Sequence, residues 1–308
     1  MRSAMWAVVL AVMVAACGAP QEPAPKLAKV KLVLPGPCTE TYQDKPAAAR
    51  AGTALRAEAR RYLARQPGRV VYMARDLRTG ATVGQGEHEH DMITASGAKV
   101  DILTALLDRR HRLSEGEKDL ATRMITESDN SAADSLWWKV GGGEGMSRLY
   151  GRLGLRETTP GPSKYWGGTH TSPADRIRLM ELLVRGGRGL RDGDRAQVLA
   201  LMERVQPEQA WGISAAARPG DKVALKNGWT PRPFVRNTWA VTSYGWVHGP
   251  GRDLLLAVQT DQQPGHGTGI RAIEGLSRLI GTRVGALDPT RTRPCVKERE
   301  RLRGPRRS

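Results

Sequence analysis

Ala95-Ser96-Gly97-Ala98-Lys99 is the stretch on which the interpretation of the whole chain depends. It begins a run in which apolar residues recur at helical spacing: Val100, Ile102, Leu103, Leu106 and Leu107. Because residues i and i+3 share a helix face, the Lys99 amine is expected to reach the Ser96 hydroxyl at the helix N-terminus. A hydroxyl is a weak nucleophile until a neighbour takes its proton, which a desolvated lysine can do. Taken alone, the motif fits a capping serine and a solvated lysine better.

Two further short motifs follow, Ser128-Asp129-Asn130 and Lys226-Asn227-Gly228. The order Ser-x-x-Lys, Ser-Asp-Asn, Lys-x-Gly resembles class A β-lactamases and penicillin-binding D,D-peptidases. The resemblance covers approximately residues 50–281. It implies a serine hydrolase that is acylated on Ser96 by β-lactams or D-alanyl peptides, with no cofactor and no metal.

The resemblance gives each catalytic residue a role. Ser96 attacks the carbonyl carbon, and Lys99 takes its proton directly or helps another base to do so. Ser128 relays a proton to the leaving nitrogen, since a hydroxyl both donates and accepts. Lys226 is expected to fix the Ser128 hydroxyl and to attract the substrate carboxylate.

Four residues are expected to bind the substrate: Asn130, Asn227, Gly228 and Trp229. Asn130 offers its amide, Asn227 stands where the family has a threonine or serine, and Gly228 lets the strand backbone approach the ligand. The family's oxyanion hole consists of two backbone N–H groups, which map onto Ser96 and Trp229. The Glu87-His88-Glu89-His90 run is interpreted as a polar loop rather than a metal site.

The sequence departs from the family where deacylation takes place. Class A enzymes carry Glu-x-x-Leu-Asn in a loop whose counterpart here is Glu157–Thr171. That loop has one acid, Glu157, and no Leu-Asn after it. The interval between Ser96 and Ser128 is also shorter than in most class A enzymes. Acylation is therefore better supported than turnover. One alternative is a penicillin-binding D,D-peptidase-like protein, and another is a non-catalytic cell-wall-binding lipoprotein.

The N-terminal residues predict export. Met1-Arg2 and an apolar run precede Val14-Ala15-Ala16-Cys17, which resembles the lipobox of bacterial lipoproteins. Residues 1–17 are interpreted as a lipoprotein signal peptide, with an ordinary secretory signal as the alternative. The protein is then secreted, extracytoplasmic and lipid-anchored to the membrane through Cys17. Residues 18–45 are predicted to be a tether, 46–285 the hydrolase domain and 286–308 a basic tail.

The net charge of +17 favours anionic partners such as acidic wall polymers. The C-terminal tail is basic but lacks interleaved aromatic residues, so nucleic acid is not expected to be a partner. Cys38 and Cys295 remain if Cys17 carries lipid. In an oxidising compartment they are expected to form a disulfide, with two free thiols as the open alternative.

The periodicity of the chain predicts an α/β (α+β sandwich) fold. We expect an antiparallel sheet flanked by N- and C-terminal helices, with an all-helical insertion and a loop at 157–168. Helices are expected at 46–65, 96–107, 114–128, 146–153, 172–183, 194–205 and 269–280. Strands are expected at 69–75, 81–85, 223–225, 238–247 and 254–260. The resemblance implies the β-lactamase/transpeptidase-like version of this fold.

Overall fold

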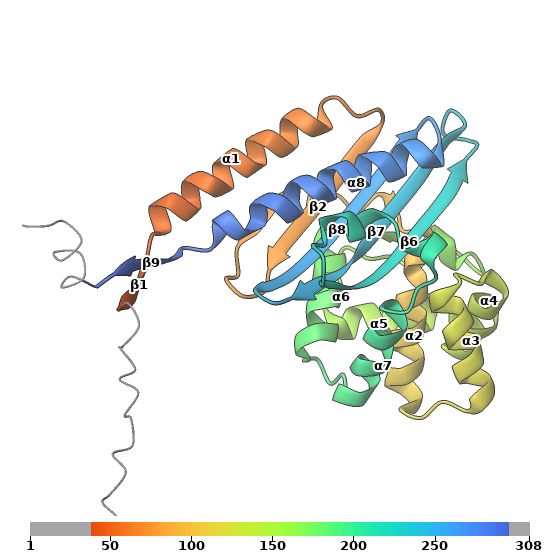
Figure 1. The fold of residues 1–308 in the computed structure, drawn as a ribbon. Helices are drawn as coiled ribbons and strands as arrows, with labels where there is room; N and C mark the ends of the chain where they lie inside the picture. The colour runs from red at the N-terminus through yellow and green to blue at the C-terminus, as the bar shows by residue number, and fades with distance from the viewer. Residues whose placement is uncertain (1–37, 296–308) are drawn as a thin grey trace, which may run out of the picture. The chain divides into compact units, whose positions relative to one another are not determined.

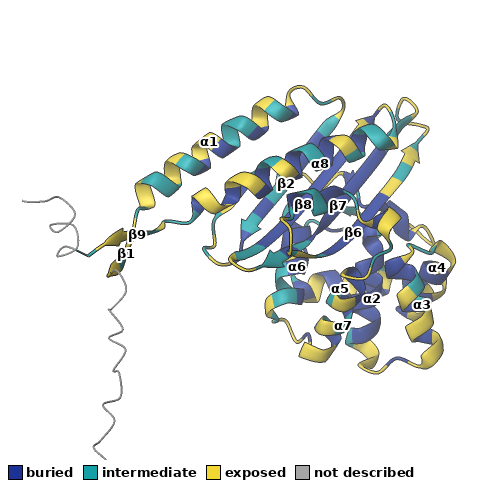
Figure 2. Ribbon diagram, viewed as in Figure 1, coloured by how far each residue is buried: buried dark blue, intermediate teal, exposed yellow. Residues whose placement is uncertain are grey.

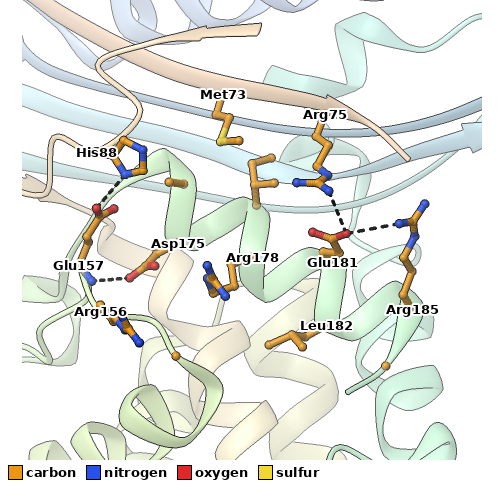
Figure 3. A pocket seen from close by; sticks show the side chains of 14 residues that line it. Met73, Arg75, His88, Arg156, Glu157, Asp175, Arg178, Glu181, Leu182 and Arg185 are labelled. Carbon is orange, nitrogen blue, oxygen red and sulfur yellow. Dashed lines mark hydrogen bonds and ion pairs between the residues drawn. The ribbon is translucent and has the colours of Figure 1, made fainter. Parts of the chain in front are cut away.

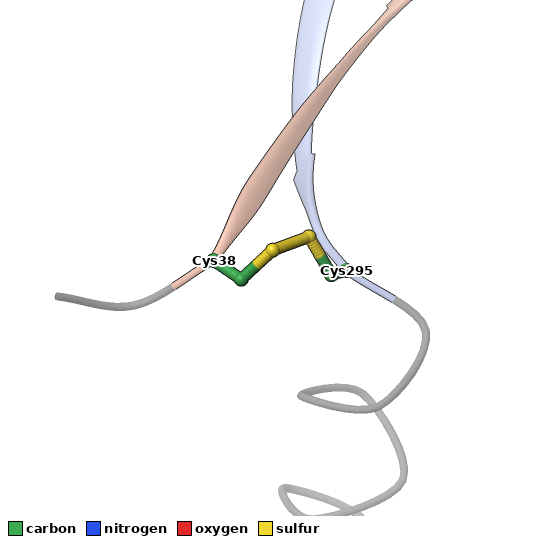
Figure 4. The surroundings of a disulfide bond; sticks show 2 residues. All are labelled: Cys38 and Cys295. Atoms are coloured by element: carbon green, nitrogen blue, oxygen red, sulfur yellow. A yellow bond between two sulfur atoms is a disulfide. The ribbon is translucent and has the colours of Figure 1, made fainter. Parts of the chain in front are cut away.

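A computed structural model describes residues 38–295. Within them, 41–293 form one unit, and 38–40 with 294–295 belong to another. In the smaller unit Cys38 and Cys295 form a disulfide with their Cα atoms 5.5 Å apart (Figure 4). The Cys295 N–H also donates to the Cys38 carbonyl oxygen at 3.0 Å. The predicted signal peptide, Cys17 and most of the predicted tether lie outside the described residues.

A five-stranded antiparallel sheet forms the centre of the larger unit, in the spatial order β3-β2-β8-β7-β6 (Figure 1). Its strands are β2 Arg69–Asp76, β3 Thr82–Gln85, β6 Lys222–Arg232, β7 Thr238–Gly249 and β8 Arg252–Gln263. The middle strand β8 is buried almost throughout, because helices cover both faces of the sheet. Gly251 makes the tight β7–β8 turn with φ 69°.

Two long helices cover one face of this sheet, α1 (Lys45–Leu63) and α8 (His266–Arg283) (Figure 1). Figure 2 shows their buried residues on the side toward the sheet and their exposed residues on the other. Leu55 of α1 and Ile273 of α8 belong to the same apolar core as Val258 of β8. The amphipathic period of each helix therefore fixes which of its faces meets the sheet.

The helical block covers the opposite face. Its helices are α2 Ala98–Arg110, α3 Glu115–Thr126, α4 Asn130–Lys139, α5 Gly142–Leu153, α6 Pro173–Arg185 and α7 Asp192–Met202. Residues 98–107 of α2 are buried on every side, polar Lys99, Asp101 and Thr104 included. A helix buried all round is the core of its block, so α2 gives the residues at its N-terminus a rigid support.

The structure confirms the predicted fold, with an antiparallel sheet, a helix at each end and an inserted helical block. It adds α4 and two small sheets that were not predicted. One pairs β4 (Met92–Ile93) with β5 (His170–Thr171), and the other pairs β1 (Thr39–Gln43) with β9 (Thr290–Pro294). β1 lies within the predicted tether (18–45) and β9 within the predicted tail (286–308). Such short strands exist through non-local pairing, which leaves no periodic signal.

Short 3-10 turns connect these elements: η1 Ala95–Gly97, η2 Trp166–Gly168, η3 Pro207–Gln209, η4 Gly212–Ala216 and η5 Val284–Leu287. Among residues 38–295, no helix has the length and apolar character needed to span a bilayer. The η1 turn packs against β6.

Candidate active site

Ser96 lies in the η1 turn, immediately before α2. The preceding residue, Ala95, has a φ of 46°, in the left-handed region that residues with a Cβ rarely adopt. Strained backbone of this kind persists where the surrounding packing fixes it, and it is concentrated at functional sites. The turn holds the half-buried Ser96 side chain at the N-terminal end of α2, where the helix dipole favours negative charge.

The Lys99 amine is surrounded by oxygen atoms. Its Nζ lies 3.1 Å from Ser96 Oγ and 3.0 Å from Ser128 Oγ. It donates to the Ser128 carbonyl oxygen at 2.6 Å and to Asn130 Oδ1 at 2.7 Å. A neutral amine has two N–H donors, which these last two oxygens accept. Its lone pair is then left to accept the Ser96 proton.

Burial lowers the pKa of Lys99 to about 7, although the carboxylates of Asp129 and Asp134 act in the opposite direction. The Trp166 ring covers the amine, with Nζ 4.8 Å from the ring centroid. A lysine with the ordinary pKa of about 10.4 is almost entirely protonated at neutral pH and has no lone pair to offer. The lowered pKa and the short distance to Ser96 are the two properties that a base for this serine requires.

Ser128 stands between two lysines. Its Oγ is 3.0 Å from Lys99 Nζ and 3.1 Å from Lys226 Nζ. Lys226 is fully buried on β6 and donates to the Asn227 carbonyl oxygen at 3.0 Å. Burial, together with the nearby Lys99 charge, lowers the pKa of Lys226 well below its ordinary value. Since two adjacent buried ammonium groups repel, at least one amine is neutral and the hydroxyl can pass a proton between them.

Gly228 brings β6 directly against the Ser96 turn. A Cβ atom at this position would lie 2.5 Å from the Thr94 carbonyl oxygen, 2.7 Å from the Ser96 nitrogen and 2.9 Å from the Gly97 nitrogen. No side chain fits at those distances, so only glycine allows this approach. The close contact places the β6 backbone beside the Ser96 amide.

A cleft of about 490 Å³ opens onto Ser96. Of the predicted site residues, Asn130 and Trp229 line it together with Ser96. Two more of its lining side chains are aromatic and exposed, Trp138 by 61% and Tyr165 by 51%. Large apolar side chains are normally buried, so their exposure around one cleft marks a surface that binds a ligand.

Sequence reasoning missed Asp134 and Trp166, which also line the cleft. Trp166 Nε1 donates to Asp134 Oδ1 at 2.7 Å and so ties the 157–171 loop to α4. Asp134 lies four residues after Asn130, on the same face of α4. That spacing was the available signal, but α4 itself was not predicted.

Two predicted site residues, Asn227 and Lys226, do not line this cleft. Asn227 was expected to bind substrate, but it is fully buried and its Nδ2 donates to the carbonyl oxygens of Gln209 at 2.7 Å and Trp211 at 3.0 Å. It therefore fastens the segment around η3 to β6. Lys226 was expected to attract a substrate carboxylate, yet its buried amine does not line the cleft and instead supports Ser128.

Glu157 is held away from the Ser96 cleft. His88 Nδ1 lies 2.8 Å from its Oε1 (Figure 3). The Ser172 hydroxyl donates to its Oε2. Ser172 is also the N-cap of α6. The carboxylate thus connects the His88 turn to the start of α6. Glu157 lines a different cleft from the one that contains Ser96.

A buried ion pair fixes α2 behind the site. Arg176 of α6 donates to Asp101 Oδ1 at 2.6 Å, and both side chains are completely buried. The Tyr150 hydroxyl donates to the other Asp101 oxygen at 2.9 Å. Tyr244 packs against the Arg176 guanidinium and donates to the Gly97 carbonyl oxygen at 2.8 Å. The network therefore reaches the Ser96 turn itself.

The arrangement of one serine, two lysines and a second serine beside an antiparallel sheet agrees with a known family. The model of the β-lactamase enzyme family matches residues 116–284, more than half of the chain. The chain belongs to the β-lactamase enzyme family. The match begins after Ser96 and Lys99, so the geometry of η1 and α2 adds the first motif to it.

The similar proteins are a lipoprotein by name and solved structures with the same fold. LppW of Mycobacterium tuberculosis, a protein named as a lipoprotein, is 29% identical over 197 residues, which span 61% of this chain and 61% of LppW. A β-lactamase from Xanthomonas campestris is 19% identical with a TM-score of 0.66, covering 76% of this chain and 98% of its own. A mutant of PBP-A, solved as an acyl-enzyme with penicillin G, is 22% identical with a TM-score of 0.64, covering 75% and 96%. These solved structures share the fold.

Proposed function

We propose that this protein is an extracytoplasmic serine hydrolase that forms an acyl-enzyme on Ser96 with β-lactams or D-alanyl amides. The observation that carries the proposal is the cluster of Ser96, Lys99 and Ser128 at hydrogen-bond distances, with a lysine pKa of about 7. The PBP-A mutant of similar fold, solved as an acyl-enzyme with penicillin G, supports the proposal. Incubation with a fluorescent penicillin tests the proposal. A persistent labelled band is expected. Rapid turnover of the penicillin would indicate an efficient β-lactamase, and neither label nor turnover would indicate a wall-binding protein without catalysis.

Each residue of the cluster has a separate role in the proposed acylation reaction. Ser96 Oγ attacks the carbonyl carbon while its proton moves to the neutral Lys99 amine. The backbone N–H groups of Ser96 and Trp229 are the proposed donors to the oxyanion, each worth about 2.7–4 kcal/mol. The C–N bond then breaks as Ser128 Oγ gives its proton to the leaving nitrogen and receives one from Lys99. Lys226 holds the Ser128 hydroxyl during this relay.

The cleft supports binding of an amide substrate with an apolar substituent. Asn130 Oδ1 already accepts from Lys99, so its Nδ2 is the group that faces an incoming carbonyl oxygen. Trp138, Tyr165 and Trp229 offer apolar faces on the rim, against which a substituent can pack.

The proposal includes attachment to a membrane. LppW is named as a lipoprotein, which supports lipidation of Cys17 after removal of the predicted signal peptide. A membrane-bound protein of net charge +17 would lie among the acidic polymers of the wall. The proposed substrate at this location is a β-lactam or a peptidoglycan-type peptide.

The acylation rate is expected to depend on pH through Lys99. Its folded pKa of about 7 means that the amine is protonated below pH 7 and loses its activity as a base there. The rate should fall about tenfold per pH unit below 7 and level off above it. Stopped-flow measurement of penicillin acylation between pH 5 and 9 gives this profile. In Asp134→Asn the midpoint should move to lower pH, because the Asp134 charge raises the pKa of Lys99. A flat profile would contradict the role of Lys99.

Deacylation is expected to be slow. Hydrolysis of the ester needs a base that activates a water molecule beside Ser96, and Glu157 is engaged by His88 and Ser172. Pre-steady-state kinetics should show a burst of one equivalent of penicillin followed by a phase at least tenfold slower. Each tenfold loss corresponds to about 1.4 kcal/mol of transition-state stabilisation.

Two carboxylate variants make the deacylation test specific. Glu157→Gln should change the rate of the slow phase by less than about twofold, because this side chain does not line the Ser96 cleft. Asp134→Asn changes the one carboxylate that does line the cleft among the described residues, and it should slow the phase further. A fast steady state that collapses in Glu157→Gln would instead identify Glu157 as the deacylating base.

A further inference from the structure

A second cleft of about 490 Å³ lies on the side of the sheet that the helical block covers, bounded by α6, β2 and residues 154–157 (Figure 3). It does not share a lining residue with the Ser96 cleft. Charged side chains dominate its walls, four of them arginines: Arg75, Arg156, Arg178 and Arg185.

The carboxylates of this second cleft are already neutralised or hydrogen-bonded by the protein. Their partners are His88 and Ser172 for Glu157, the Glu157 N–H and the Thr158 hydroxyl for Asp175, and Arg75 with Arg185 for Glu181. None of these contacts involves the guanidinium of Arg156 or of Arg178. The three carboxylates in the walls therefore interact with groups other than these two guanidinium groups.

Two arginines in the cleft remain without a protein partner. Across residues 38–295, the exposed side chains of Arg156 and Arg178 make neither a hydrogen bond nor an ion pair, and Figure 3 shows both beside the engaged carboxylates. Arg75 adds a buried Nε that lacks a hydrogen-bond partner in the same part of the chain. A buried donor without a hydrogen-bond partner is unfavourable. Guanidinium groups bind carboxylate and phosphate oxygens in a bidentate manner.

The rest of the lining is apolar. Met73 of β2 and Ile177 and Leu182 of α6 contribute to the walls between the charged groups. A cavity of this size and mixed character is typical of small-molecule sites, in which a few polar groups orient an otherwise apolar ligand.

We infer that this second cleft binds a small organic anion, with its phosphate or carboxylate group between Arg156 and Arg178 and its apolar part against Met73 and Leu182. The site is separate from the proposed acylation chemistry, so its failure would leave that chemistry untouched. It lies at the Glu157 end of the loop that carries Trp166 to the Ser96 cleft. A ligand here would therefore contact the same loop from its other end.

Isothermal titration calorimetry at constant ionic strength tests this site, with phenyl phosphate, benzoate and inorganic phosphate as probes. Constant ionic strength keeps the electrostatic screening of this basic protein the same for every probe. We expect phenyl phosphate or benzoate to bind more tightly than inorganic phosphate, because only these two carry an apolar part. Tighter binding of phenyl phosphate would identify a phosphate ligand, and tighter binding of benzoate a carboxylate ligand.

The double variant Arg156→Gln/Arg178→Gln should weaken binding at least tenfold, while Arg271→Gln on the opposite face of the sheet should not change it. Burst acylation by penicillin should remain intact in all three proteins, which shows that they are folded. Absence of binding by the wild-type protein would overturn the inference. So would binding that the double variant retains, or a loss of equal size in Arg271→Gln.

Discussion

Replacing Lys99 with methionine is expected to slow the acylation of Ser96 by about 10²–10⁴-fold. Methionine keeps the length and the apolar stem of lysine but provides no base within reach of Ser96 Oγ. Lys99 Nζ, at 3.1 Å, is the amine that contacts this hydroxyl, whereas Lys226 contacts Ser128. Stopped-flow kinetics with a chromogenic β-lactam at pH 8 measures the effect.

A surface lysine provides the control for Lys99→Met. Lys118 on α3 is exposed and pairs with Glu115 one turn away. Lys118→Met should therefore acylate at the wild-type rate. Should Lys99→Met acylate within about threefold of wild type, another residue takes the Ser96 proton and the assignment of the base is wrong.

Arg176→Met is expected to lower the free energy of unfolding by about 3–5 kcal/mol. The substitution leaves the Asp101 carboxylate buried with the Tyr150 hydroxyl as its remaining hydrogen-bond partner. An unpaired buried charge is far more costly than the loss of a surface ion pair. Urea denaturation followed by circular dichroism measures the difference.

Two comparisons test the explanation for Arg176. Arg178→Met changes an exposed arginine on the same helix and should alter stability by less than about 0.5 kcal/mol. The double variant Asp101→Leu/Arg176→Met removes both charges and should recover most of the loss. If the double variant is as unstable as Arg176→Met, packing rather than the unpaired charge causes the effect.

The contact between Ser96 and Lys99 could be predicted because it is local. Both residues lie within one turn of a helix whose apolar pattern is plain in the sequence. Ser128 and Lys226 come from distant segments, and no local rule brings them to Ser96. Their place was predicted through the resemblance to a family, and the structure puts both at hydrogen-bond distance in one cluster.

The remaining features depend on partners that sequence patterns do not specify. Asn227 turns away from the cleft because two backbone carbonyl groups of the segment around η3 accept its amide. Trp166 was placed only in a loop, and its role follows from a hydrogen bond to Asp134. Charged residues such as Arg176 are ordinarily exposed, so its complete burial follows from a carboxylate on another helix.

The most direct test of the account is the intact mass of the protein after incubation with penicillin G. The wild-type protein should gain the mass of one penicillin molecule, and peptide mapping should place the adduct on Ser96. Ser96→Ala should fold normally and gain no mass, since alanine is well tolerated at the start of a helix. An adduct of undiminished yield in Ser96→Ala, or its absence from the wild-type protein, would contradict the assignment of Ser96 as the nucleophile.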